Sequence, residues 1–263
     1  MKSAIKYAAL LSVLIGAGAI FMGSLQNEKD RTSFLPALHL PSIPLPFQNS
    51  IALSGKVVEE VRPVSFFDSI KLPGSGKLTV HIGDTPSLTV RADKALLDRI
   101  TTEQKGTTLI LSQKDGIGFT IRSPIEYELT TPSLRELSIT GSGNVVFANR
   151  LTGERLSIEV AGAGNIQGDL DLKELEISIL GSGNLALTGS VNRLTHKVLG
   201  SGDLHGISLN GKSASITILG SGKTDIGTFE ELNVTIAGSG DVIYSGTPRI
   251  QSRVPGSGKL RSR

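Results

Sequence analysis

The Gly-Ser-Gly-Lys-Thr segment that begins at Gly220 has the residue types of a known binding motif. A phosphate-binding loop ends in this way, because its backbone amides and lysine surround the phosphates. That loop also requires an earlier glycine, which would fall at Thr217. The same Gly-Ser-Gly-Lys recurs at Gly74 and Gly256, where no helical pattern follows. We therefore interpret the run as a structural corner and predict no nucleotide or other cofactor site.

A second set of candidate residues directly follows the Gly-Ser-Gly tripeptides and would form a polar row if the tripeptides stack. The row comprises Asn144, Asn165, Asn184, Asp203, Lys223, Asp241 and Lys259. One interpretation is a ligand or cation track, because Asn and Asp oxygens coordinate calcium. The other is that Asn and Asp tolerate turn geometry and form local hydrogen bonds. We favour the second and predict no metal site, because lysine interrupts the row and the nine-residue calcium repeat is missing.

Paired carboxylates are a third possible source of chemistry, since enzymes that cleave polysaccharides use two of them. In a stack of strands, Asp203 and Asp241 would lie about 10 Å apart, which is wide even for an inverting pair. Lys223 would lie between them. Glu159 and Glu176 would lie one coil apart without any supporting group. We predict no catalytic residue.

Two histidines lie in the same region. His196 occupies an apolar position of the pattern, so we predict a core residue with satisfied hydrogen bonds. His205 follows an inward leucine, so we predict that it faces solvent.

The last repeat contains a cluster of basic residues and no acidic one. The cluster comprises Arg249, Arg253, Lys259, Arg261 and Arg263. Such a cluster could bind an anionic partner such as an acidic glycan. The alternative, which we favour, is that charge and Pro255 protect an exposed strand edge. The net charge of +3 is too small to indicate nucleic acid.

The elements that must position these residues are set by an internal repeat. The tripeptide, once Gly-Ala-Gly, begins at Gly74, Gly141, Gly162, Gly181, Gly200, Gly220, Gly238 and Gly256. From Gly141 onward the spacings are 21, 19, 19, 20, 18 and 18 residues. A constant period of this kind indicates one structural unit that is used repeatedly.

Apolar and polar residues alternate on both sides of each tripeptide, which is the pattern of a strand on either side of a corner. A single coil cannot bury enough apolar surface to offset its conformational entropy, whereas stacked coils share one core. The glycines fit a corner that needs positive φ or close backbone approach. The sequence therefore predicts an all-β fold, a right-handed parallel β-helix (β-solenoid) of about 18–21-residue coils.

Domain boundaries follow from the composition. We assign residues 51–263 to the β-helix, with irregular first coils over 51–130, a short helix near 94–99, and regular coils over 131–263. Four prolines make residues 28–50 an extended linker, or a segment that packs on the first coil. The chain has no cysteine, which excludes disulfides and thiolate chemistry.

Residues 1–27 have the pattern of an export signal, with Lys2 and Lys6 before an apolar run. Ala17-Gly18-Ala19 fits a cleavage site, whereas residues 7–25 approach the length that spans a bilayer as an inner-membrane anchor. We keep both alternatives. In either case the folded part is expected in the periplasm or outside the cell, with membrane contact only through this segment.

Several motifs occur in a recognisable order. FDSIKL, ADKALLDRI and GTTLILS precede the GSGN and GSGD corners, and VIYSGTP follows late in the chain. This order, over roughly residues 55–260, resembles the auto-transporter adhesin head domain family, also called the head GIN domain. The resemblance implies a right-handed β-helix in an exported bacterial protein, with no defined catalytic residues.

These observations lead to a functional expectation. We expect a non-catalytic, adhesin-like or structural envelope module that binds a glycan or a protein through its strand faces. The alternatives are a polysaccharide-active enzyme, which needs converging carboxylates in a groove, and a regulatory envelope domain, which needs a deep ligand pocket.

Overall fold

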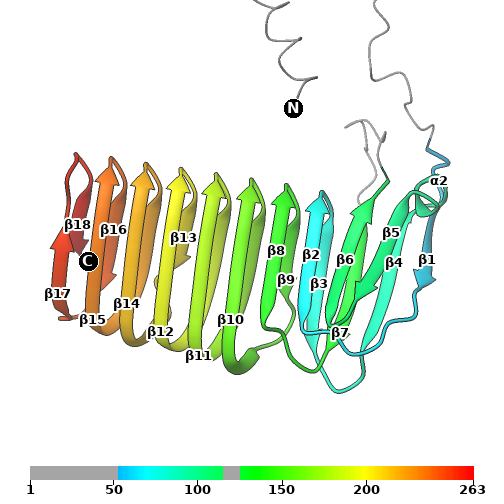
Figure 1. The fold of residues 1–263 in the computed structure, drawn as a ribbon, viewed down its shortest axis with the longest axis horizontal. Coiled ribbons are helices and arrows are strands. Elements are labelled where there is room, and N and C mark those ends of the chain that lie inside the picture. The colour runs from blue at the N-terminus through cyan, green and yellow to red at the C-terminus, as the bar shows by residue number, and fades with distance from the viewer. Residues whose placement is uncertain (1–52, 115–124) are drawn as a thin grey trace, which may run out of the picture. The chain divides into compact units, whose positions relative to one another are not determined.

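The computed structural model describes residues 53–114 and 125–263, which are almost entirely β-strand (Figure 1). The parallel strands form a β-solenoid of about seven turns, which confirms the predicted fold. In these two ranges, no helix has the length and apolar character needed to cross a membrane. The predicted signal or anchor (1–27) and linker (28–50) lie outside the described residues.

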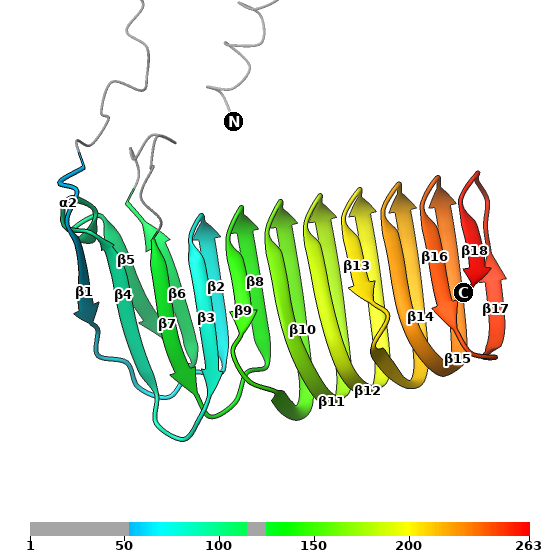
Figure 2. The same cartoon turned by 180° about the vertical axis from the view of Figure 1, so that it is seen from behind.

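Each regular coil has two legs that meet at the Gly-Ser-Gly corner. The first leg leads into the corner, and the second leg leaves it toward a bend at the opposite side (Figure 2). First legs are β2 (Ser69–Gly74), β8 (Glu136–Gly141), β10 (Leu151–Gly162), β14 (Leu209–Gly220) and β17 (Arg249–Arg253). Second legs are β3 (Lys77–Ile82), β9 (Asn144–Phe147), β13 (Asp203–Gly206), β16 (Asp241–Ser245) and β18 (Lys259–Ser262).

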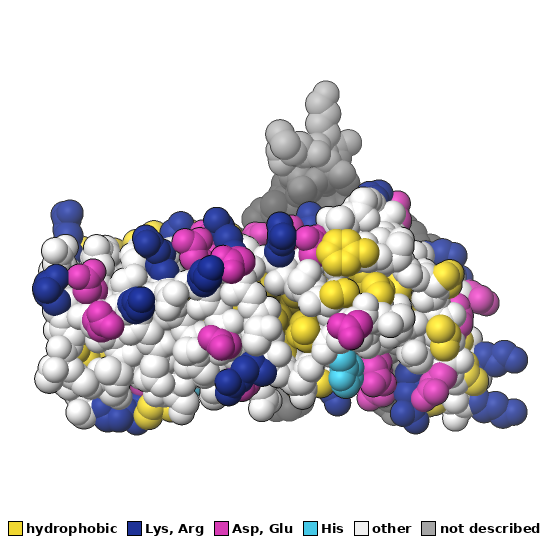
Figure 3. All heavy atoms as spheres, turned by 90° about the horizontal axis from the view of Figure 1, so that it is seen from below, with side chains coloured by type: hydrophobic (Ala, Val, Ile, Leu, Met, Phe, Trp, Pro, Cys, Tyr) yellow, Lys and Arg dark blue, Asp and Glu magenta, His cyan; other side chains and the backbone are white. Residues whose placement is uncertain are grey.

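Three long strands pass through the bend, so that each supplies a second leg and the first leg of the next coil. They are β11 (Asn165–Gly181), β12 (Asn184–Gly200) and β15 (Lys223–Gly238). Within the first legs the register is constant, and the first glycine of each corner pairs with its counterpart, as Gly162 does with Gly181. The bends and neighbouring surface seen in Figure 3 carry interspersed acidic and basic side chains.

The corner glycines have the two roles expected of them. Gly181 has φ +136, a region that favours glycine. A Cβ on Gly181 would overlap the carbonyl oxygen of Gly162, and one on Gly183 would lie 2.7 Å from a Val160 methyl. The Ser182 amide donates a hydrogen bond to the Gly162 carbonyl (2.8 Å). The corner is therefore a backbone-to-backbone stack that leaves no room for side chains at its glycines.

Alternating residues of both legs fill one core between them. In β11, the side chains of Ile166, Leu170, Leu175, Ile177 and Ile179 are buried, and equivalent residues of neighbouring coils lie above and below them. Burying each Leu or Ile stabilises the fold by about 1.5–3 kcal/mol. The core is thus continuous along the solenoid, as the alternation predicts.

Around residues 51–130, the order of the coils in space differs from their order in the chain. The β2–β3 coil lies between β8–β9 on one side and β6 (Thr108–Gln113) with β7 (Glu126–Thr131) on the other. The chain therefore builds outward from β2–β3 and then returns to begin the regular stack on its other side.

The N-terminal region also contains antiparallel strands, for which the sequence analysis made no prediction. These are β1 (Val57–Val61), β4 (Ser87–Asp93) and β5 (Ile100–Lys105), and they pair with β4, β7 and β6 respectively. For β5 and β6 the physical reason is local: two residues, Gly106 (φ +61) and Thr107, connect these strands as a tight hairpin. The short helix expected near 94–99 is α2 (Lys94–Leu97), capped by the Asp93 side chain, which accepts from the Ala95 amide.

Candidate functional site

The predicted polar row forms as a continuous line beside the corners. Asn144, Asn165, Asn184 and Asp203 pair in register through successive second legs. The row continues through Lys223, Asp241 and Lys259, which also pair in register. The sequence therefore placed every member of this row correctly relative to its neighbours.

Hydrogen bonds inside the row use much of its polar capacity. The Asn165 side-chain amide donates to Asn144 Oδ1 (2.8 Å), and that of Asn184 donates to Asn165 Oδ1 (3.2 Å). Asp203 and Asp241 each accept from the backbone amide of the next coil, at Lys223 (2.7 Å) and Lys259 (3.0 Å). Within the described ranges, no three acidic or histidine side chains gather as a metal site would require. The row therefore ties coils together.

An open groove of about 270 Å³ runs along the Asn part of the row. Its lining includes the outward residues Val146, Gln167, Ala186 and His205 of successive second legs. His205 is exposed, as predicted. The groove is a shallow feature of a sheet face with amides along one side.

The C-terminal basic cluster is largely neutralised by the two preceding coils. Arg249 pairs with Glu231 (3.0 Å), and Arg261 pairs with Asp241. Arg263 donates to both carboxylate oxygens of Asp225 (2.6 Å each). Arg253 lies on the fully exposed strand β17, and Lys259 begins β18. These contacts fit a protected end more closely than an anion-binding patch.

The other carboxylates considered from the sequence do not converge. Lys223 separates Asp203 from Asp241 in the row, as expected. Glu176 lies near Arg155 (2.9 Å) and Lys197 (3.9 Å), and its register partner on β10 is Ser157 rather than Glu159.

His196 is fully buried in the core, between Ile177 and Ile216 of the adjacent coils. The expectation that its hydrogen bonds are satisfied is wrong, because neither ring nitrogen has a partner among the described residues. Burial lowers the pKa of His196 to about 3, so the ring is neutral at physiological pH. The inward strand position fixed its burial, and its register neighbours Ile177 and Ile216 are aliphatic.

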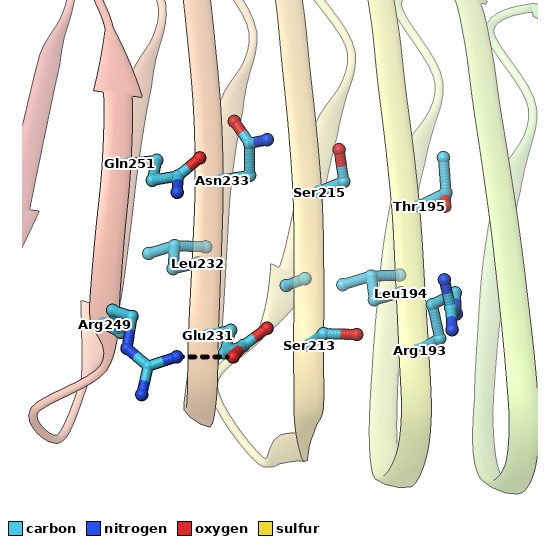
Figure 4. Close-up of a pocket in the computed structure, with 11 residues that line it drawn as sticks. Arg193, Leu194, Thr195, Ser213, Ser215, Glu231, Leu232, Asn233, Arg249 and Gln251 are labelled. Carbon is cyan, nitrogen blue, oxygen red and sulfur yellow. Dashed lines mark hydrogen bonds and ion pairs between the residues drawn. The ribbon is translucent and has the colours of Figure 1, made fainter.

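A second groove, of about 280 Å³, lies on the first legs of β12, β14, β15 and β17 (Figure 4). Its lining consists of Arg193, Leu194, Thr195, Ser213, Ala214, Ser215, Glu231, Leu232, Asn233, Arg249 and Gln251. Sequence reasoning missed this groove. The signal for it was Ala214, which replaces the leucine found at the same place in the neighbouring first legs, Leu194 and Leu232.

The first legs also expose a short apolar stripe one residue before the corners. Leu180, Leu199 and Leu219 pair in register and are 42%, 47% and 46% exposed. Exposed leucines at successive positions form a continuous strip rather than scattered contacts.

Comparison with known families identifies the chain. Residues 66–248 match the family described as "Putative auto-transporter adhesin, head GIN domain". The chain belongs to this family. The resemblance seen in the sequence is thereby confirmed. No curated protein matches the chain.

Solved structures share the fold of this GIN-family chain. A putative adhesin from Bacteroides fragilis is 22% identical with a TM-score of 0.76, and the match covers 80% of this chain and 99% of that one. A putative lipid binding protein from Parabacteroides distasonis is 26% identical with a TM-score of 0.67, covering 82% and 100%. A putative adhesin from Parabacteroides merdae is 20% identical with a TM-score of 0.65, covering 80% and 98%.

Proposed function

We propose that this protein is a non-catalytic, exported envelope module that binds an extended glycan or protein through its outward strand faces. The observation that supports this most directly is the register of the coils, which repeats the same outward positions along each face. The repeat of about 4.8 Å offers a row of equivalent hydrogen-bonding positions to an extended partner. Membership in an adhesin-like family is consistent with display outside the cytoplasm.

The proposal assigns no catalytic step to the carboxylates of these faces. Asp203 and Asp241 accept backbone hydrogen bonds, and Glu231 pairs with Arg249. A polysaccharide-cleaving enzyme would instead need two carboxyl groups directed at one bond. The alternative of a regulatory domain is less favoured, because the two grooves described are shallow rather than deep.

In this proposal, residues 1–27 direct export and either are removed or hold the protein at the inner membrane. Residues 28–50 act as a spacer, and the membrane is contacted only through the N-terminal segment.

The test is binding of the full-length chain, in a polyoxyethylene detergent, to an array of envelope glycans and proteins. The release of reducing ends is followed in the same wells. Saturable binding without release is expected. Cleavage would replace the proposal with an enzyme, and absence of binding to every polymer would replace it with a purely structural role.

A second candidate function, binding to a lipid surface, is favoured by the stripe of Leu180, Leu199 and Leu219. The Parabacteroides distasonis neighbour is named as a putative lipid binding protein. Because the chain has no cysteine, Leu199→Cys introduces a unique site for an environment-sensitive dye. A blue shift in liposomes at this site, absent for Thr195→Cys, would support the lipid function. Equal spectra at the two sites would count against it.

A further inference from the structure

We propose that the groove centred on Ser213, Ala214 and Ser215 binds a neutral saccharide unit. This inference rests on the proposed function, because it assigns one site and one ligand class to the binding module. The groove volume of about 280 Å³ lies just below the roughly 300–1,000 Å³ typical of ligand sites. It therefore fits a short segment of a glycan better than a large ligand.

The groove exists because one coil has small side chains at three consecutive positions. Ser213 lies in register between Arg193 and Glu231, and Ser215 lies between Thr195 and Asn233. Beneath them, Ala214 lies between Leu194 and Leu232, as Figure 4 shows for the two leucines. The long side chains of the neighbouring coils thus surround a hollow above β14. The hollow is a local departure from the repeat.

The exposed side chains along the groove are polar. The side chains of Leu194, Ala214 and Leu232 are buried beneath it, so the residues on either side of them form its surface. Thr195, Ser215, Asn233 and Gln251 follow one side in register, and hydroxyl and amide groups both donate and accept hydrogen bonds. A row of such groups complements the many hydroxyl groups of a saccharide.

The charges at the groove favour an uncharged ligand with many hydroxyl groups. Arg193 and Glu231 lie on either side of Ser213, and each lacks an opposite charge at that position. Their other neighbours are Glu174, 3.9 Å from Arg193, and Arg249, 3.0 Å from Glu231. A hydroxyl above Ser213 can accept from the guanidinium or donate to the carboxylate. Because Arg193 and Glu231 each already lie near an opposite charge, the groove offers no unpaired charge to an ionic ligand.

The experiment is a titration of the full-length chain, in a polyoxyethylene detergent, with defined oligosaccharides of three to six units. The probes are neutral gluco- and manno-oligosaccharides, an oligogalacturonate and a glucosamine oligomer. Neutral probes are expected to bind most tightly. The double variant Ser213→Gln/Ser215→Gln fills the groove from outside the core and is expected to raise their Kd at least about tenfold.

One control variant and one further groove variant make the result specific. Ser157→Gln changes the equivalent position on β10, outside the groove, and is expected to leave the Kd unchanged. Glu231→Gln preserves size and is expected to weaken the binding of neutral probes, because it replaces a charged carboxylate acceptor with a weaker amide acceptor. If Glu231→Gln strengthens binding and the protein prefers oligogalacturonate to the neutral probes, the proposed ligand class is wrong.

The failures of the two proposals are distinguishable. Saccharide binding that all groove variants leave unchanged overturns the groove site and leaves the proposed function standing. Binding to an array protein without any saccharide binding would likewise overturn the groove site and leave the proposed function standing. A chain that binds nothing on the array or in the titration overturns both.

Discussion

The regular coils from β8 onward and the N-terminal region from β1 to β7 use similar strands but order them differently. In the regular coils, each coil stacks on the one before it in the chain, as the pairings of β10 with β8 and of β14 with β12 show. In the N-terminal region, the β2–β3 coil lies between strands that come after it. The difference shows that a constant period with a corner in every coil enforces sequential stacking. Where corners are missing, local hairpins and antiparallel pairing determine the order.

The largest expected effect comes from changing a corner glycine. In Gly181→Ala, the new Cβ overlaps the Gly162 carbonyl at positive φ, and strain with overpacking should cost roughly 3 kcal/mol or more. Gly106→Ala in the N-terminal hairpin meets no atom within 4 Å and should cost only about 1 kcal/mol for its positive φ. Urea unfolding of both variants measures the comparison. Equal losses would mean that the corners are no more constrained than a surface hairpin.

The next prediction concerns how the stability of the two regions depends on pH. His196 has a folded pKa of about 3 against 6.5 unfolded, so the unfolded state binds the extra proton between these values. Stability is therefore lost as pH falls below about 6.5, by about 2 kcal/mol at pH 5. His196→Ile should remove this loss and, by replacing unpartnered ring nitrogens, stabilise the protein by about 1–2 kcal/mol at pH 7. A wild-type loss at pH 5 that persists in His196→Ile would contradict the assignment.

In the N-terminal region, Asp93 is the ionisable group to compare with His196. Burial raises the pKa of its carboxyl, but hydrogen bonds from Ala95, Ser54 and Gly55 outweigh burial, so the net pKa is lowered. Its contribution is present above the unfolded pKa of about 3.8 and is lost only below it. Hydrogen exchange at pH 5 should therefore show opening of the regular coils around His196 before the segment around Asp93. The reverse order would indicate that another group controls acid sensitivity.

The smallest effect concerns the polar row. Asn165→Ala removes one hydrogen bond to Asn144 and one from Asn184, and should cost about 0.5–1 kcal/mol because the row is exposed. Thr101→Ala in the N-terminal hairpin removes a single contact to Ser112 (2.6 Å) and should cost slightly less. Thermal unfolding of both variants gives the comparison. A stabilised Asn165→Ala would instead indicate that the row is kept for ligand binding.

The sequence by itself determined the repeating coil, the buried faces, the glycine corners and the polar row. These follow from a fixed period and strand alternation, since registered stacking places each residue next to its counterpart one coil away. Only the tertiary structure decided the position of the β2–β3 coil, the unpartnered state of His196 and the groove above Ala214. Each of these depends on which side chains meet from different coils or non-sequential strands, and such contacts are absent from the local pattern of any one coil.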